Sequence, residues 1–166
     1  MAAIAETERL RLREFRPDDL DDLARMFGDA DQMRFYPGLR TRPEASAWIN
    51  RNLALYRARG YGFWCVELTT DGGGFAGYCG IRPLDLHGTD ETEIGWHIKK
   101  TFWNHGLASE AAGAVRELAS TRFGLTRLVA LVYPEHSASR RVAEKIGMRA
   151  AGSTVLEGDP YVIYVT

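Results

Sequence analysis

The chain has 166 residues, 45% of them hydrophobic and 26% charged, and its formal net charge at pH 7 is −1. These values are ordinary for a soluble protein with a hydrophobic core, and they argue against nucleic-acid binding driven by overall charge. No apolar run approaches the length of a membrane span, and the first residues, MAAIAETERL, lack the basic and apolar regions of a signal peptide. We therefore expect a cytoplasmic protein that forms one domain over residues 1–166 and binds neither nucleic acid nor membrane.

The first third of the chain predicts a strand followed by two helices. Residues 9–15 alternate between polar and apolar side chains, so they are expected to form a strand. Apolar residues then recur at helical spacing from Pro17 to Gly28, and again from about Glu44 to Arg59. Acidic residues dominate positions 14–31 and arginines dominate positions 34–59. These charges are either solvated helix faces or a rim that steers a charged substrate.

A glycine-rich hairpin is predicted next. Its strands are GFWCVELT and FAGYCGIRP, with the glycines of DGGG at the turn, and Pro83 is expected to end the second strand. Two glycines inside that strand, Gly77 and Gly80, indicate a bulge or a close approach of another backbone. Cys65 and Cys79 are candidate cross-strand neighbours, although reduced core thiols are the expected state in the cytoplasm. The spacing of the two cysteines and four histidines predicts no metal site.

The second half alternates strands and helices. In the predicted strand ETEIGWHIKK, one face carries Ile94, Trp96 and Ile98, and the other carries Glu93, Gly95 and His97. A helix is expected after Gly106, followed by the apolar strand LTRLVALVY. A short helix, HSASRRVAEKIG, is expected to bury Ala138, Val142 and Ile146, and two strands at about 148–156 and 160–166 close the chain. The order predicts a mixed α/β fold in which the unit 92–133 makes a parallel strand pair.

The turn FWNHGLAS in this unit is a candidate anion site. It follows a strand and opens a helix, where unpaired amides and the positive end of the helix dipole can hold a phosphate without a side-chain charge. Gly106 allows a ligand to approach the backbone, but a P-loop would need a second glycine and a lysine, so phosphoryl transfer is disfavoured. A plain tight turn explains the single glycine equally well.

The stretch ETEIGWHIKKTFWNHGLASEA, followed by RLVALVYPEHSASRRVAEKIGMRAAG, resembles the GNAT superfamily of acyl-CoA N-acyltransferases. It is most similar to the branch that includes the Rim-type ribosomal-protein N-terminal acetyltransferases, and the N-terminal stretch TERLRLREFRPDDL has the same likeness. The resemblance implies a central mixed, mostly antiparallel sheet of about seven strands with helices on both faces. It also implies metal-free transfer of an acetyl group from acetyl-CoA to an amine, by a monomer or a homodimer.

The resemblance also implies a set of cofactor-binding residues. The family signature, Arg or Gln followed after two residues by Gly-x-Gly/Ala, falls on Trp103 to Ala108, with Trp103 in place of the Arg or Gln and Asn104 where a further glycine is common. Amides of the turn are then expected to hold the pyrophosphate, and the end of the preceding strand is expected to pair with the pantetheine. The residues so assigned are Trp96, His97, Ile98, Trp103, Asn104, His105, Gly106, Leu107, Ala108, Ser109, His136 and Ser139.

Two positions depart from the family pattern. His136 stands where the family often has Asn, and Ala143 stands where many members have the tyrosine that protonates the leaving thiolate. Ser139 is the nearest hydroxyl, so it is the candidate acid. Both His136 and Ser139 could instead be ordinary residues at the start of a helix.

Glu93 is the candidate general base, acting on the acceptor amine directly or through a water. Its alternative is a solvated carboxylate on a strand. Phe35, Tyr36 and the arginines of 40–59 are expected to line the acceptor entrance, together with Glu93. The candidate acceptors are protein N-termini, aminoglycosides, polyamines and amino acid analogues. A non-catalytic CoA-binding or regulatory module is the alternative to an enzyme.

Overall fold

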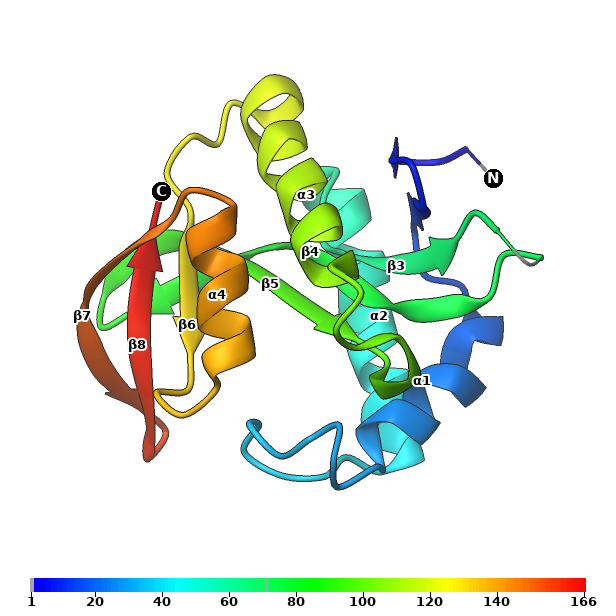
Figure 1. Ribbon diagram of the computed structural model, residues 1–166, viewed down its shortest axis with the longest axis horizontal. Helices are drawn as coiled ribbons and strands as arrows, with labels where there is room; N and C mark the ends of the chain where they lie inside the picture. The colour runs from blue at the N-terminus through cyan, green and yellow to red at the C-terminus, as the bar shows by residue number, and fades with distance from the viewer. Residues whose placement is uncertain (1, 71) are drawn as a thin grey trace.

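The computed structural model describes residues 2–70 and 72–166. Within these residues the chain forms four α-helices and one eight-stranded sheet (Figure 1). The helices are α1 (Leu20–Phe27), α2 (Arg42–Arg59), α3 (Leu107–Phe123) and α4 (Ser137–Lys145). The strands are β1 (Ala5–Glu6), β2 (Leu10–Arg13), β3 (Phe63–Leu68), β4 (Phe75–Leu86), β5 (Thr89–Ile98), β6 (Val129–Val132), β7 (Arg149–Leu156) and β8 (Asp159–Val165).

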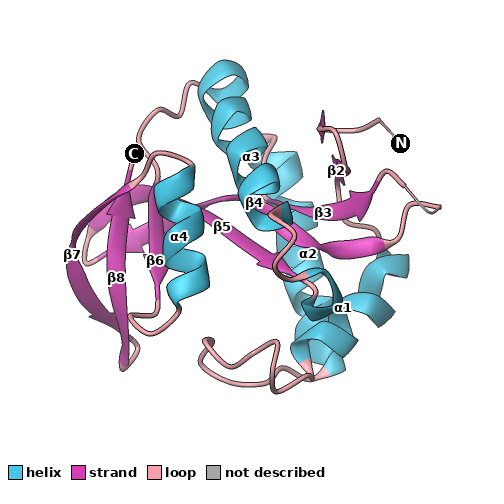
Figure 2. Ribbon diagram, in the orientation of Figure 1, coloured by secondary structure: helices cyan, strands magenta, loops and turns pink. Residues whose placement is uncertain are grey.

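The strands follow the order β1-β2-β3-β4-β5-β6-β8-β7. All neighbours are antiparallel except β5 and β6, which are parallel. Figure 2 shows α3 and α4 on one face of the sheet and α1 and α2 on the other. The predicted mixed, mostly antiparallel sheet with helices on both faces is therefore confirmed, with eight strands where about seven were expected.

Each face of the sheet has its own hydrophobic cluster. The α3 side buries Ile94 and Ile98 of β5 among the apolar residues of α3, as the sequence pattern predicts. The other side packs α1 and α2 against β3 and β4, where Trp48 lies at the centre of a group of aromatic rings. His97, which alternates with the buried isoleucines, packs edge-on against Tyr78 of this second cluster. The end of β5 is therefore held in place from both sides of the sheet.

The buried face of α4 differs from the prediction. Ala143 and Ile146 are buried, Val142 is half-buried, and Ala138 is exposed. Val142, Ala143 and Ile146 belong to the cluster on the α3 side of the sheet, whereas Ala138 lines a cleft. Ala138 was therefore wrongly assigned to the core, because its helical spacing from Val142 does not distinguish a residue that faces a cleft from one that faces the core.

The prediction that Pro83 ends its strand was also wrong. β4 continues to Leu86, and Pro83 lies opposite Thr92 of β5. The pairing of β3 with β4 stops at Gly80, so beyond that point β4 is an edge on its β3 side. Proline lacks an N–H group and is tolerated at such an edge, where no neighbouring strand needs its donor.

The expected irregularity at the glycines of β4 is present. The register between β3 and β4 shifts between Val66 and Glu67, and Gly77 has a φ of 142°. A Cβ atom at Gly77 would collide with the carbonyl oxygen of His97, and one at Gly80 would collide with the backbone of Gly62. Glycine therefore allows the strands on either side of β4 to pack closely.

The two cysteines are not cross-strand neighbours. Cys65 lies opposite Tyr78 and Cys79 lies opposite Trp64, so the two thiols point to different faces of the sheet. Both are buried and free, and burial raises the pKa of each thiol well above its usual value. They serve as small core residues.

A buried ion-pair network joins β2, the start of α1 and β3. Arg13 donates two hydrogen bonds of 2.8 Å to Asp19, and it also contacts Glu67 at 2.6 Å. The sequence pattern did not reveal this network, because Asp19 resembled one of several solvated acids in the first turn of a helix.

Among the residues that the structure describes, no helix combines the length and the apolar character needed to cross a membrane.

Candidate active site

A cleft lies where two neighbouring parallel strands separate. β5 and β6 have a single register pair, Glu93 with Val129, and Figure 2 shows the strands diverging from there toward the loop that links α1 to α2. A cleft of about 560 Å³ occupies this region, between the end of β5, the turn before α3, the first turns of α4 and residues 31–36. Its size is in the range of small-molecule and cofactor sites.

Thirteen of the fifteen site residues proposed from the sequence line this cleft. They are Phe35, Tyr36, Trp96, His97, Ile98, Trp103, Asn104, Gly106, Leu107, Ala108, Ser109, His136 and Ser139. The two that do not line it are Glu93 and His105. The structure thus brings together residues that are separated by up to about a hundred positions in the chain.

The turn before α3 presents unpaired backbone donors to the cleft. The first helical hydrogen bond runs from the Glu110 N–H to the Gly106 carbonyl, at 3.1 Å. The N–H groups of residues 107–109 precede it and have no acceptor among the described residues. Gly106 has a φ of 75° and Asn104 a φ of 63°. Asparagine tolerates this left-handed conformation better than most side chains, so it can replace the glycine that is common at position 104.

Trp103 connects the turn to the end of β5. Its indole N–H donates a 2.8 Å hydrogen bond to the carbonyl of Ile98, while the ring remains 44% exposed along the cleft. His105 points elsewhere: its side chain is exposed, and its Nδ1 atom lies 3.2 Å from the carbonyl oxygen of Phe102.

Two stacked aromatic pairs line the cleft. Phe35 stacks on His136 with ring centroids 4.3 Å apart, and Tyr36 stacks on His97 at 4.6 Å. Each pair joins the loop after α1 to an element of the cleft. Phe35 and Tyr36 line the cleft, held there by these contacts. Arg40 and the arginines of α2 are not among the lining residues, and their role at an acceptor entrance stays a prediction.

Gln32 fixes this loop to β5, and no sequence pattern pointed to it. Its side-chain amide donates to the carbonyl of Ile98 at 3.3 Å, and its side-chain oxygen accepts from the N–H of Lys100. The Gln32 carbonyl lies 3.0 Å from Nε2 of His97. Burial lowers the pKa of His97 to about 3, so this imidazole is neutral at physiological pH and does not act as a cationic acid.

Ser139 is oriented by Trp96. The indole N–H of Trp96 donates a 3.1 Å hydrogen bond to Oγ of Ser139. With one lone pair occupied in this way, the hydroxyl proton of Ser139 can be donated to a ligand. Ala143, by contrast, is fully buried, so a side chain at this position reaches the core rather than the cleft.

Glu93 lies at the point where β5 and β6 begin to separate. Its carboxylate is 13% exposed and accepts a 2.5 Å hydrogen bond from Nε of Arg82, whose side chain is 48% exposed. The negative charge of Glu93 raises the pKa of Arg82. The carboxylate is therefore within reach of solvent but is paired with a guanidinium, and it lies outside the cleft lining.

Basic side chains that the sequence did not single out also line the cleft. Arg141 and Lys145 are one helical turn apart on α4, and Lys100 follows β5. Their spacing on α4 was a usable signal, since residues four apart share a helix face. In residues 2–70 and 72–166, no group of three or more His, Cys, Asp or Glu side chains is arranged to hold a metal ion.

Comparison with known proteins identifies the family. The model of the acetyltransferase (GNAT) domain matches residues 9–149. The uncharacterised protein YkkB of Bacillus subtilis (strain 168) is 33% identical over 159 residues, which is 95% of this chain and 92% of YkkB. The uncharacterised N-acetyltransferase YnaD of the same organism is 33% identical over 150 residues, 88% of this chain and 82% of YnaD. This chain belongs to the GNAT acetyltransferase family, and it is an acetyl-CoA-dependent acyltransferase.

Solved structures agree on the fold. An acetyltransferase from Agrobacterium tumefaciens str. C58 superposes with a TM-score of 0.85 at 26% identity, covering 98% of this chain and 92% of that chain. RimL, a ribosomal L7/L12 alpha-N-protein acetyltransferase solved in complex with coenzyme A, gives a TM-score of 0.80 at 18% identity, covering 99% of this chain and 97% of that chain. At 18% identity, this second likeness establishes the shared fold alone.

Proposed function

We propose that this protein transfers the acetyl group of acetyl-CoA directly to a primary amine, either a protein N-terminus or a small amine. The observation that carries the proposal is the meeting of three features in one cleft: the unpaired amides before α3, the diverging edge of β5, and the hydroxyl of Ser139. In an α/β sheet, a ligand binds where strands diverge at their carboxyl ends.

The cofactor is proposed to follow the cleft from α3 to β5. The pyrophosphate lies against the amides of residues 104–109, whose unsatisfied donors and helix dipole favour an anion. The pantetheine runs along Trp96, His97 and Ile98, whose edge has no register pair with β6 in the described residues. Residues assigned to the cofactor from the sequence thus fit an extended thioester, with His136 and Ser139 on the α4 side.

The acceptor is proposed to enter past Phe35 and Tyr36. Acyl transfer needs a neutral amine, a donor for the developing oxyanion and a thiol that can leave. The amine nitrogen attacks the thioester carbonyl, the carbon–sulfur bond breaks, and the amide and free thiol are formed. A backbone N–H of β5 polarises the carbonyl, as the family resemblance implies.

Two side chains move the protons. Glu93 accepts the proton that the amine loses, through a water, because its carboxylate lies outside the cleft lining. Ser139 donates a proton to the thiolate. A thiol with a pKa of about 8.5 leaves almost unaided, so the contribution of Ser139 is small.

The pairing of Glu93 with Arg82 favours a second mechanism, in which the acceptor arrives as a free amine from solution and Glu93 does not act as base. In that mechanism the carboxylate stays paired with the guanidinium at 2.5 Å, and Ala143 supplies no hydroxyl for the leaving thiolate. The two mechanisms differ in the pH dependence of turnover and agree on cofactor binding.

The test is a thiol-release assay with acetyl-CoA and a panel of amines. The panel contains peptides with free N-termini, a polyamine, an aminoglycoside and free amino acids, and mass spectrometry identifies the acetylated nitrogen. The enzyme is expected to release thiol in step with the formation of one acetylated amine. Saturable binding of acetyl-CoA without thiol release by any amine of the panel would contradict the proposed acceptor class.

A further inference from the structure

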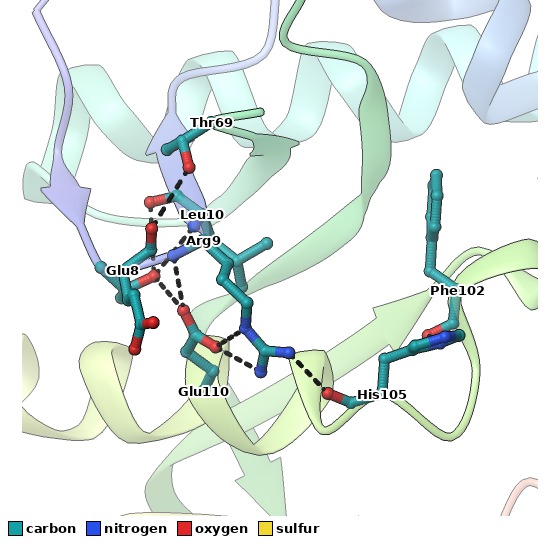
Figure 3. Close-up of polar contacts among 8 residues, drawn as sticks. Glu8, Arg9, Leu10, Thr69, Phe102, His105 and Glu110 are labelled. Atoms are coloured by element: carbon teal, nitrogen blue, oxygen red, sulfur yellow. Dashed lines mark hydrogen bonds and ion pairs between the residues drawn. The ribbon is translucent and has the colours of Figure 1, made fainter. Parts of the chain in front are cut away.

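The N-terminal segment is hydrogen-bonded through Arg9 to the turn that precedes α3. Figure 3 shows the side chain of Arg9 lying between Glu110 and the backbone of His105. Its Nη1 donates a 2.9 Å hydrogen bond to the carbonyl of His105, and its Nε donates a 2.7 Å bond to Glu110. A third nitrogen, Nη2, lies 2.6 Å from the same carboxylate. One guanidinium therefore connects the turn with the first turn of α3, both of which are about a hundred residues away in sequence.

Arg9 is itself held by hydrogen bonds on both sides. The backbone N–H of Arg9 donates to Glu110 at 3.0 Å, and the hydroxyl of Thr7 donates to the same oxygen at 2.6 Å. On the other side, the N–H of Thr69 donates to the carbonyl of Arg9 at 2.9 Å. Because both its main chain and its side chain are anchored, Arg9 presents its guanidinium in a fixed position.

The contact to His105 decides which way one peptide group points. A trans peptide is planar, so the carbonyl of His105 and the N–H of Gly106 point in opposite directions. Arg9 and the side chain of His105 lie outside the lining of the cleft, whereas Gly106 belongs to it. As long as the carbonyl stays on Arg9, the Gly106 N–H points away from Arg9, and Gly106 itself borders the cleft.

Rotation about the backbone bonds of His105 and Gly106 would turn this peptide group if the contact were absent. Gly106 has a φ of 75°, and glycine accepts left-handed and right-handed conformations about equally. A rotated peptide would direct a carbonyl oxygen, with its partial negative charge, toward a bound anion. Gly106 lets a ligand approach the backbone closely, but it does not fix the direction of the peptide group. That direction must be set by a hydrogen-bond partner of the peptide group.

We propose that Arg9 is a positioning residue for the cofactor: it holds the His105 carbonyl so that the amide of Gly106 points at the pyrophosphate of acetyl-CoA. The inference rests on the proposed function, which places the pyrophosphate at this turn. Arg9 acts through the backbone and does not touch the reacting atoms, so its loss is expected to weaken cofactor binding and leave the chemical step intact.

The experiment compares Arg9→Met with Arg11→Met. Arg11 is on the same segment and pairs with Glu6 at 2.9 Å in an exposed position, so it is a matched control for the loss of a surface arginine and its ion pair. Isothermal titration gives the Kd of coenzyme A, and steady-state kinetics gives KM and kcat for acetyl-CoA and for S-acetylpantetheine, which lacks the pyrophosphate. Arg9→Met is expected to raise the Kd of coenzyme A about tenfold or more, the effect of one charged hydrogen bond. Its kcat, and its KM for S-acetylpantetheine, should stay near those of the wild type.

Two further variants keep the proposal open to refutation if Arg9→Met unfolds or acts by charge alone. Arg9→Lys preserves the attraction to Glu110 but lacks the planar fork that reaches the carbonyl as well, so it should remain folded and still lose affinity for coenzyme A. The double variant Arg9→Met with Glu110→Gln should stay weak. Recovery of the wild-type Kd in the double variant would overturn the proposal, because repulsion by Glu110 would then explain the loss.

Failure of the inference and failure of the proposed function are distinguishable. If wild-type protein does not bind coenzyme A, the proposed cofactor site is wrong. If wild-type protein binds it and Arg9→Lys binds it equally well, the site stands and the positioning role of Arg9 is refuted. If Arg9→Met raises the Kd of coenzyme A and the KM for S-acetylpantetheine by the same factor, that role is also refuted.

Discussion

Replacing Asp19 with asparagine should destabilise the protein strongly and in a pH-dependent way. The Asp19 carboxylate accepts two hydrogen bonds of 2.8 Å from Arg13 and one of 2.7 Å from the backbone N–H of Arg16. The side chains of Arg13 and Asp19 are only 7% and 11% exposed. The substitution Asp19→Asn would leave a buried guanidinium with one carboxylate, that of Glu67, in place of two.

The size of the effect follows from this burial. Removing one partner of a buried ion pair costs about 3 to 5 kcal/mol, and the remaining contact with Glu67 places the expected loss near the lower value. For a chain of this size, about 3 kcal/mol corresponds to a fall in Tm of roughly 6 to 12 °C. The matched control is Asp22→Asn, because Asp22 is more exposed and lies 3.4 Å from Arg25. An exposed pair of this kind contributes less than about 1 kcal/mol.

The pH dependence has a definite sign. Burial alone would raise the pKa of Asp19, but the hydrogen bonds from Arg13 and Arg16 outweigh it and lower the pKa below its usual value. A carboxylate with a lowered pKa stabilises the fold above its unfolded-state pKa of about 3.9, and this contribution is lost as pH falls through the folded-state value. The difference in unfolding free energy between wild type and Asp19→Asn should therefore be constant from about pH 5 to 8 and shrink below about pH 4.

Denaturant unfolding at several pH values measures this difference. The reasoning is refuted if Asp19→Asn loses no more stability than Asp22→Asn at pH 7. It is also refuted if the difference between wild type and Asp19→Asn is the same at pH 3 as at pH 7.

Three further predictions concern the proposed site. Glu93→Gln should lower kcat/KM about a hundredfold or more near pH 7, and the loss should shrink toward pH 9, where the amine arrives deprotonated. The control is Glu91→Gln, because Glu91 is on the same strand and is paired with Arg127. If the pH-rate profiles of the two variants show equal losses, Glu93 is not the base. Ser139→Ala should slow turnover modestly, more than Ser137→Ala at the start of the same helix, and wild-type rates from pH 6 to 9 would make Ser139 structural. Gly106→Val should abolish the rise in Tm that acetyl-CoA causes. Gly106→Asn should retain most of that rise, because asparagine tolerates the φ of 75° and valine does not. If folded Gly106→Val still shows the rise in Tm, the cofactor binds at another place.

Local patterns revealed the elements and the turn before α3. The alternation in β5 correctly separated Ile94 and Ile98 from His97, since the period of a strand is a property of neighbouring residues. The turn at Gly106 was found because a strand, a glycine and a helix follow one another directly in the chain. The parallel pairing of β5 with β6 was predicted for the same reason, from a helical crossover of sufficient length.

Contacts between distant segments could not be predicted in this way. Gln32 is an ordinary residue in an irregular loop until folding places it beside His97 and the end of β5. The pairing of Asp19 with Arg13 and of Arg9 with the turn before α3 likewise depends on where separate segments meet. The wrong prediction for Pro83 has the same origin. Proline is a local signal that ends a strand, and only the length of β3 shows that Pro83 lies on an edge of β4.

The most direct test of the proposed cofactor site follows the backbone amides of the turn before α3 as coenzyme A is added. In a ¹⁵N-labelled protein, the amide resonances of Asn104 to Ser109 report contact between the pyrophosphate and the donors that have no acceptor among the described residues. We expect these resonances to shift in a saturable manner, with smaller changes at the α2 amides on the other side of the sheet. Saturable binding of coenzyme A that leaves the resonances of Asn104 to Ser109 unchanged would contradict the proposed site.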